Sequence, residues 1–381
     1  MSKAYMTNSP KPSVVMRKDI VVIDNGSGFM KVGFAGSNRP EYVFPTVLGV
    51  PVVGRGITAL KSFLHVSRPI DRGRVRNWEK MKMLWGFSFD LLGVKPSSCK
   101  LFLTEPLFNA ESDRERMAEI MFEHFGVNAL YISEQPLLAM YAHGGTTGLV
   151  VDIGHGLTQV APIYEGFVIP RAVNIAPLGG TDVTTFLIRL LMKKGYSLTD
   201  AMGTEVAEDI KERLCYVILD PESGRGESGD SSARDSFYKL PDGTLVKLDE
   251  ELFMAPEVLF NPLLMGLDVS SLPELVLDSV MACDIDQRRD LLKNIILCGG
   301  TSLLKGLGER LERELGDRLR KMSVRVEPKV IMPKSREFYA WIGASKLASI
   351  IESKGLWMTK HDYQERGPSV INEKAKPILS Y

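Results

Sequence analysis

The chain has 381 residues, and its 47 basic and 47 acidic residues give a formal net charge of zero at pH 7. This balance provides no overall field that would favour nucleic acid or an anionic membrane surface. No apolar run reaches the roughly 18 residues that a membrane span needs, and the length predicts two or more domains. The four cysteines lie far apart, without the pairing of a metal site, and no secretory signal is recognised. This favours a reducing compartment, the cytosol or the nucleus.

The chain begins with a basic segment that leads to a strong strand signal. Residues 1–18 contain basic residues and prolines but no acidic residue, which predicts a disordered lead-in. The apolar run 20–23 then stops at Asp-Asn-Gly-Ser-Gly, residues 24–28. An apolar run that ends in two glycines predicts a buried strand that turns back on itself.

The residues of this turn suit an anion. Gly26 and Gly28 have no Cβ, so their backbone N–H groups can converge on a phosphate. Ser27 adds a hydroxyl donor, and Lys31 on the returning strand would meet the same phosphates. Asp24 at the strand end suits a divalent cation held through water. Taken alone, the same pattern is also that of an ordinary hairpin turn.

Two helices are predicted in the next part of the chain. Residues 112–115 have the Ser-x-x-Glu spacing of a capping box, and the apolar residues from Met117 to Phe125 fall on one helix face, which predicts core packing. Gln135 follows the predicted strand 130–132 and starts the second helix. A polar side chain at such a place is often only a cap.

The glycine turn recurs in the second half of the chain. The strand 149–151 leads into Asp-Ile-Gly-His-Gly at 152–156, and the strand 294–297 leads into a third turn that precedes a helix. Two hairpins from two halves of the chain could clamp a polyphosphate, and a helix N-terminus would add N–H donors. Three such turns argue against a purely structural role. The residues of the second and third turns that would face the phosphates are Asp152, Gly154, His155, Gly156, Gly299, Gly300 and Thr301.

Two more helices and a loop are predicted in this half. A glycine pair ending at Gly180 precedes an amphipathic helix that Gly195 ends. Leucines recur at every fourth position from Leu303 to Leu319, which predicts one buried stripe on a helix and not a zipper. Residues 221–236 are rich in Gly and Ser and predict a polar loop.

Many strings of this sequence stand where actin carries the same or a similar string, over about residues 19–371. They include DNGSG, KVGFAG, PIDRG, NWEKM, LTEPLFN, SEQPLLAMYA, TTGLVVDIG, DIKERLCYV, YKLPDGT, CGGT and WIGAS. The chain therefore resembles actin and the actin-related proteins, within the wider class of sugar kinases and heat-shock chaperone ATPases. The motifs are numerous and collinear, and they point to the actin branch of this class.

The resemblance implies a fold, a domain organisation and a ligand. The expected fold class is α/β, the actin-like ATPase fold, with two duplicated RNase H-like domains around a nucleotide cleft and a smaller lobe on each. The first domain would comprise residues 19–142 plus 339–381, with a shortened outer lobe at 46–68. The second would comprise residues 143–338, with an inserted lobe at about 179–267. The implied ligand is ATP or ADP with Mg²⁺ or Ca²⁺.

The resemblance also implies roles for single residues. Gln135 matches the glutamine that positions the attacking water, and Asp152 is expected to take part in catalysis. Asp24 and Asp152 are the expected metal-binding carboxylates. Further nucleotide-binding residues that the resemblance implies are Gly180, Lys211 and Glu212, the last two as contacts to adenosine.

Five positions of the implied site depart from the family. His155 stands where the family has an aspartate near the metal, and Gln159 stands where it has a histidine that helps to organise the attacking water. Glu337, Glu208 and Leu304 replace a lysine, an arginine and a tyrosine around the adenine. These changes are either drift in a protein that still binds ATP, or a loss of hydrolysis or even of binding. We expect binding to be retained and hydrolysis to be slow at most.

Three classes of protein remain: a filament-forming actin, a divergent actin-related protein that is an ATP-bound structural subunit of a larger assembly, and a kinase-type enzyme. No substrate-carboxylate motif supports the kinase. The segment 46–68 is too short for both a full lobe and a long loop, and Lys346 replaces an apolar residue of the family. These features favour the second class, with cytoskeletal or multi-subunit complex proteins as partners, including actin or other actin-related proteins, and without nucleic acid.

Overall fold

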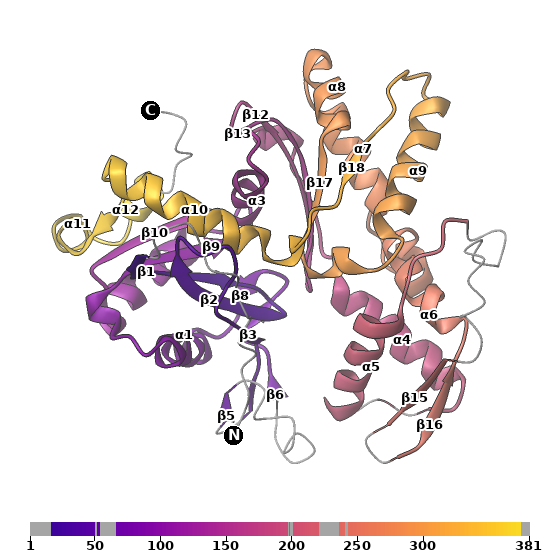
Figure 1. Cartoon of the computed structure of the whole chain (residues 1–381), viewed down its shortest axis with the longest axis horizontal. Helices are drawn as coiled ribbons and strands as arrows, with labels where there is room; N and C mark the ends of the chain where they lie inside the picture. Colours follow the sequence, from indigo (N-terminus) through magenta and orange to yellow (C-terminus); the bar gives the residue numbers. More distant parts are fainter. Residues whose placement is uncertain are drawn as a thin grey trace.

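The structure is a computed structural model, which describes residues 17–49, 52–53, 66–196, 198, 201–220, 236–240 and 243–374. Two β-sheets with helices packed around them dominate the described part (Figure 1). The predicted lead-in up to residue 16 and the predicted polar loop at 221–235 lie outside the described residues. Residues 50–51 and 54–65 of the predicted outer lobe also lie outside them.

The first sheet has six strands in the order β19-β10-β9-β1-β2-β3. Its strands are β1 (Arg17–Asn25), β2 (Phe29–Ala35), β3 (Tyr42–Pro45), β9 (Lys100–Glu105), β10 (Ala129–Glu134) and β19 (Met358–Thr359). β1 pairs antiparallel with β2 and parallel with β9, and β9 pairs parallel with β10. The prediction of a lead-in through residue 18 was wrong at its end, because Arg17 already pairs with Ala35 in the sheet.

The second sheet repeats this plan. Its order is β13-β12-β11-β17-β18, and β14 also pairs with β12. Its strands are β11 (Gly148–Ile153), β12 (Thr158–Tyr164), β13 (Phe167–Val168), β14 (Asn174–Ala176), β17 (Ile295–Cys298) and β18 (Val330–Ile331). Here β11 pairs antiparallel with β12 and parallel with β17, as β1 does with β2 and β9. The predicted duplicated α/β fold is therefore confirmed.

The helices lie on the faces of the sheets and between them. In chain order they are α1 (Trp78–Leu92), α2 (Glu111–Glu119), α3 (Gln135–His143), α4 (Gly180–Lys193), α5 (Ala201–Leu214), α6 (Glu251–Met254), α7 (Leu272–Met281), α8 (Ile285–Lys293), α9 (Leu307–Lys321), α10 (Tyr339–Lys354), α11 (Lys360–Arg366) and α12 (Val370–Lys374). Figure 1 shows α3 and α10 between the two sheets. In the parts of the chain that are described, none of these helices combines the length and apolarity of a membrane span.

Short elements complete the described chain. Three two-residue strands, β4 (Leu48–Gly49), β5 (Val52–Val53) and β6 (Val66–Ser67), form a small sheet in the predicted outer lobe. Two hairpins are made by β7 (Ile70–Asp71) with β8 (Arg74–Val75) and by β15 (Ser236–Lys239) with β16 (Leu245–Leu248). The short helical turns are η2 (Pro96–Ser98), η3 (Ile120–Phe125, a π-helix), η4 (Pro170–Ala172), η6 (Ala255–Leu259), η7 (Pro262–Met265), η8 (Gly300–Leu303) and η9 (Arg336–Phe338).

The first strand is buried on both of its faces. Val21 and Ile23 belong to the apolar cluster under α1 and α2, whereas Ile20 and Val22 belong to the cluster that contains Trp341 of α10. Successive side chains of a strand point to opposite faces. A strand covered on both faces therefore has a continuous apolar run, which is the pattern that the sequence shows at 20–23.

Two predicted helix starts were wrong in detail. Ala110, and not Ser112, precedes α2, and no side chain caps this helix, so Ser112 lies in the first turn and the capping box does not form. Leu303 lies outside α9 and is 48% exposed. The rest of the leucine stripe, from Leu307 to Leu319, is fully buried on one face of α9, as predicted.

Candidate functional site

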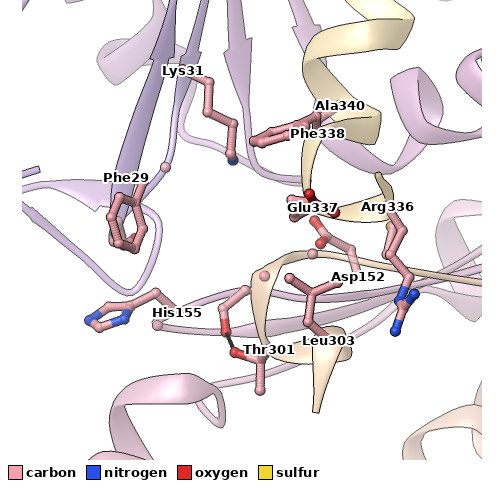
Figure 2. Close-up of a pocket in the computed structure, with 18 of the residues that line it drawn as sticks. Phe29, Lys31, Asp152, His155, Thr301, Leu303, Arg336, Glu337, Phe338 and Ala340 are labelled. Atoms are coloured by element: carbon pink, nitrogen blue, oxygen red, sulfur yellow. Dashed lines mark hydrogen bonds between the residues drawn. The ribbon is translucent and has the colours of Figure 1, made fainter. Parts of the chain in front are cut away.

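A cavity of about 540 Å³ lies where the hairpins of the two sheets meet. It is lined from both sheets, from α5, and from the segments before α9 and α10. Figure 2 shows several of the lining residues, among them Lys31, Asp152 and Glu337. The predicted site residues that line it are Asp24, Gly26, Ser27, Gly28, Lys31, Gln135, Asp152, Gly154, His155, Gly156, Lys211, Glu212, Gly299, Gly300 and Thr301. Gly180 does not line the cavity. Its carbonyl accepts a hydrogen bond from the Lys211 Nζ at 3.2 Å behind the lining.

The two hairpin turns pack directly against each other. A Cβ on Gly28 would stand 2.8 Å from the Cβ of His155, so only glycine fits there. Ser27 Oγ accepts a hydrogen bond from the backbone N–H of Gly73 at 2.9 Å. The Ser27 hydroxyl, which the sequence predicts to bind phosphate, is therefore also part of the contact between the first turn and the β7–β8 hairpin.

Asp24 is held by three partners. Lys31 Nζ lies 2.6 Å from its Oδ2, and its Oδ1 accepts hydrogen bonds from Thr104 Oγ1 at 2.5 Å and Gln135 Nε2 at 3.0 Å. This carboxylate is almost completely buried, with 1% exposed. Lys31, which the sequence placed near phosphates, thus neutralises Asp24, so Asp24 is fixed in orientation and charge-paired.

Two glutamines connect the carboxylates of the two hairpins. Gln159 Nε2 lies 3.3 Å from Asp152 Oδ2 and 3.4 Å from Gln135 Oε1, and Gln135 in turn donates to Asp24. Gln159 Oε1 accepts a hydrogen bond from the backbone N–H of Leu107 at 2.7 Å. Burial raises the pKa of Asp152 to about 6, although the Lys31 charge opposes this shift. The predicted catalytic pair, Gln135 and Asp152, is therefore brought together through Gln159.

His155 is a neutral side chain at this site. Burial and the Arg68 charge lower its pKa to about 3. Its Nε2 lies 4.0 Å from Glu208 Oε1, and the same Oε1 is paired with Arg68 Nη2 at 2.8 Å. Where the family has a carboxylate, this chain therefore has an uncharged imidazole, which supplies no negative charge to a metal ion.

Lys211 is tied to α4 and the third turn to the second hairpin. Lys211 Nζ donates to Thr184 Oγ1 at 2.9 Å as well as to Gly180, and burial lowers its pKa. Thr301 Oγ1 donates to the carbonyl of Gly154 at 2.7 Å. The helix predicted directly after the third turn was wrong in type, because η8 is a single 3₁₀ turn and α9 begins only at Leu307.

The sequence analysis did not identify Arg72, which is not among the residues lining the cavity but holds the second turn and α4 against the β7–β8 hairpin. From the β7–β8 hairpin, Arg72 pairs with Asp182 of α4 at 2.9 Å and donates to the carbonyls of Gly156 at 3.0 Å and of Pro177. It has a positive φ of 44°, which is uncommon outside glycine. The string PIDRG supported the resemblance, but a contact across 110 positions leaves no periodic signal.

The lining fits a polyphosphate with a divalent cation. Glycines of the first two turns line the cavity, and the carboxylates of Asp24 and Asp152 lie at the adjacent strand ends. Among the described residues, no cluster of three or more acidic, His or Cys side chains could hold a metal alone. A hard cation such as Mg²⁺ binds through one or two carboxylates, phosphate oxygens and water, and this donor set matches that requirement.

The chain was compared with models of known families. A family model described as Actin matches residues 16–376. The matched span includes every described element, and so both sheets and all the residues that line the cavity.

Proposed function

Because the chain belongs to the actin family, we propose that it is a divergent actin-related protein, a nucleotide-binding structural subunit with weak or no hydrolysis and little self-polymerisation. Members of this family generally bind ATP or ADP with a divalent cation and are typically cytoplasmic or cytoskeletal. The observation that carries the proposal is the linkage of Asp24 and Asp152 through Gln135 and Gln159 at one cavity. ATP is the nucleotide that the family implies.

The proposed partners are proteins of the cytoskeleton or of a multi-subunit complex, including actin or other actin-related proteins. The proposed location is the cytoplasm and its cytoskeleton, with the nucleus as a second location. A filament-forming actin with ATPase activity is the alternative, and the retained Gln135 and Asp152 favour it. Identification of stoichiometric partners after native copurification separates the two.

We expect the purified protein to carry one bound nucleotide with a divalent cation. The glycine turns and the paired carboxylates at the cavity motivate this prediction. A ligand at a hundredfold excess over its Kd stabilises the folded state by about 2.7 kcal/mol, so added Mg-nucleotide should raise the melting temperature. Denaturation followed by chromatography of the supernatant measures the bound nucleotide. An empty supernatant together with no thermal shift would refute the proposal.

We expect hydrolysis to be slow because the cleft lacks a titratable group at the position of Gln159. The amide of Gln159 is held by Leu107 and Asp152, and His155 is neutral. Loss of one activating or charge-stabilising group costs on the order of 10²-fold in rate. The double variant Gln159→His with His155→Asp should therefore hydrolyse faster in single-turnover assays. Gln159→Asn, which keeps an amide, is the control, and a wild-type rate equal to that of conventional actin would contradict this prediction.

A further inference from the structure

One end of the cavity differs in chemistry from the end with the hairpin turns. In Figure 2, Leu303, Arg336 and Glu337 lie on the side of the cavity opposite Phe29 and His155. Leu304 belongs to the same part of the lining and is 9% exposed. Apolar side chains with a few polar groups are typical of the place where a ligand's uncharged part is bound. A nucleotide whose phosphates lie at the turns would therefore place its base here.

Glu337 presents a polar atom at this end, Oε2, that has no partner among the described residues. Its Oε2 is inaccessible to solvent and makes no hydrogen bond within the described chain. The neighbouring Arg336 does not neutralise it, because its Nε and Nη2 donate to Ser302 Oγ and O at 3.1 and 3.0 Å. A buried acceptor without a donor is costly. The side chain therefore favours a ligand that brings N–H donors.

The backbone around Glu337 is fixed in place. Glu337 lies in η9, which runs directly into α10, and Trp341 of α10 is fully buried and donates to the carbonyl of Val22 at 3.1 Å. The carbonyl of Arg336 accepts a hydrogen bond from Gly299 of the third turn at 3.2 Å. The backbone of Glu337 is thus anchored to both sheets, while the carboxylate itself can rotate about its last torsion.

An ionised carboxylate accepts hydrogen bonds and donates none. The edge of guanine offers two adjacent donors, N1–H and the N2 amino group. The corresponding edge of adenine offers one donor, N6, beside the N1 lone pair, which the second carboxylate oxygen would repel. We propose that Glu337 contacts the base and makes the cleft prefer guanine nucleotides to adenine nucleotides. This inference rests on the proposed nucleotide site and replaces the adenine that family membership implies.

Equilibrium titration with Mg-GTP, Mg-ITP and Mg-ATP tests the preference. We expect GTP to bind roughly tenfold to a hundredfold more tightly than ATP, the range that a hydrogen bond to a charged group provides. ITP keeps N1–H but lacks the N2 amino group, so its affinity should be intermediate. In Glu337→Gln the amide offers one donor and one acceptor, which matches adenine, and the preference should shift toward ATP. The control is Glu309→Gln on the exposed face of α9.

The outcomes separate this inference from the proposed function. If none of the three nucleotides binds, the nucleotide site itself is refuted. If ATP binds as tightly as GTP or more tightly, and the ratio does not change in Glu337→Gln, the site stands and the role of Glu337 is refuted. If the variant does not fold, the affinities of the wild-type protein for GTP, ITP and ATP still test the role of Glu337. Equal affinities for the three nucleotides would contradict a contact from Glu337 to the base.

Discussion

Replacing Glu134 with glutamine is expected to raise the free energy of unfolding by about 3 kcal/mol at pH 8 and by only about 1 kcal/mol at pH 5. Glu134 ends β10 and is the register partner of Glu105 at the end of β9. Burial, followed by the negative charge of Glu105, raises the pKa of Glu134 to about 7 from its ordinary 4.5. An ionised Glu134 is therefore a cost to the folded state at neutral pH.

The nearest positive charge is already engaged with the other carboxylate. Arg114 donates through Nε and Nη2 to Glu105 Oε1 at 2.8 and 2.5 Å, and Asn109 donates to Glu105 Oε2 at 3.0 Å. Glu134 makes no such bond among the described contacts. Arg114 is thus bonded to Glu105, and within the described contacts Glu134 is the carboxylate without a close partner.

The sign of the pH dependence follows from the raised pKa. Between pH 4.5 and about 7 the folded protein holds the Glu134 proton while the unfolded chain has lost it, so stability falls as the pH rises through this window. Glutamine does not ionise, so the variant keeps above pH 7 the stability that the wild-type protein loses through this window. Below pH 4.5 both forms are neutral, so the gain disappears.

Urea denaturation at pH 5 and pH 8 measures this difference. Glu111→Gln, at an exposed acid in the first turn of α2, is the control; it loses only a helix-dipole interaction and should lower stability by less than about 1 kcal/mol. An equal gain from Glu134→Gln at both pH values would mean that packing is responsible. Absence of any gain at pH 8 would refute the raised pKa.

The parts of the fold that sequence patterns predicted are those with local causes. The run 20–23 is apolar because β1 is covered on both faces. The leucine stripe of α9 follows the helical period. In each case one short segment carries both the cause and the signal, so the pattern was sufficient.

The contacts that the sequence could not predict join distant segments. Arg72 of the β7–β8 hairpin reaches Asp182 of α4, which lies 110 positions further along the chain. The missing partner of Glu337 is a property of its surroundings, since Arg336 beside it in the sequence turns to Ser302. Residue types indicated that these positions were polar, but only the packed structure showed which of them are neutralised.

A further consequence of the short segment 46–68 concerns assembly. In the family, the loop of the outer lobe inserts its apolar tip into a cleft of the next subunit of a filament. Here the lobe has 23 residues, and β4, β5 and β6 use six of them in a small sheet. If the chain runs out and back as two strands, each arm has about half of the residues. At about 3.3 Å per residue, the length of one arm is under 40 Å, even before any residues are used for a turn. From this length we predict that such a loop does not reach the neighbouring subunit.

The receiving surface is changed as well. Lys346 of α10 stands where the family has an apolar residue, and its Nζ donates to the carbonyl of Ala142 at 2.8 Å near the end of α3. Its charge, after burial, also lowers the pKa of His143. An apolar segment docked here would have to cover this ammonium, which costs several kcal/mol unless its pairing is kept. We therefore predict that this surface disfavours the apolar contact that a filament needs.

We therefore expect the isolated protein to form no long helical filaments at micromolar concentration in MgATP or MgGTP and polymerising salt. Pelleting and negative-stain microscopy measure this directly, with conventional actin as the positive control. Lys346→Leu should not restore filaments, because the short outer lobe still cannot span the contact. Incorporation into another complex, or capping of an actin filament, uses other surfaces and is compatible with this result. Abundant two-stranded filaments of the wild-type protein would overturn the argument, since neither the length of residues 46–68 nor the charge at Lys346 would then limit assembly.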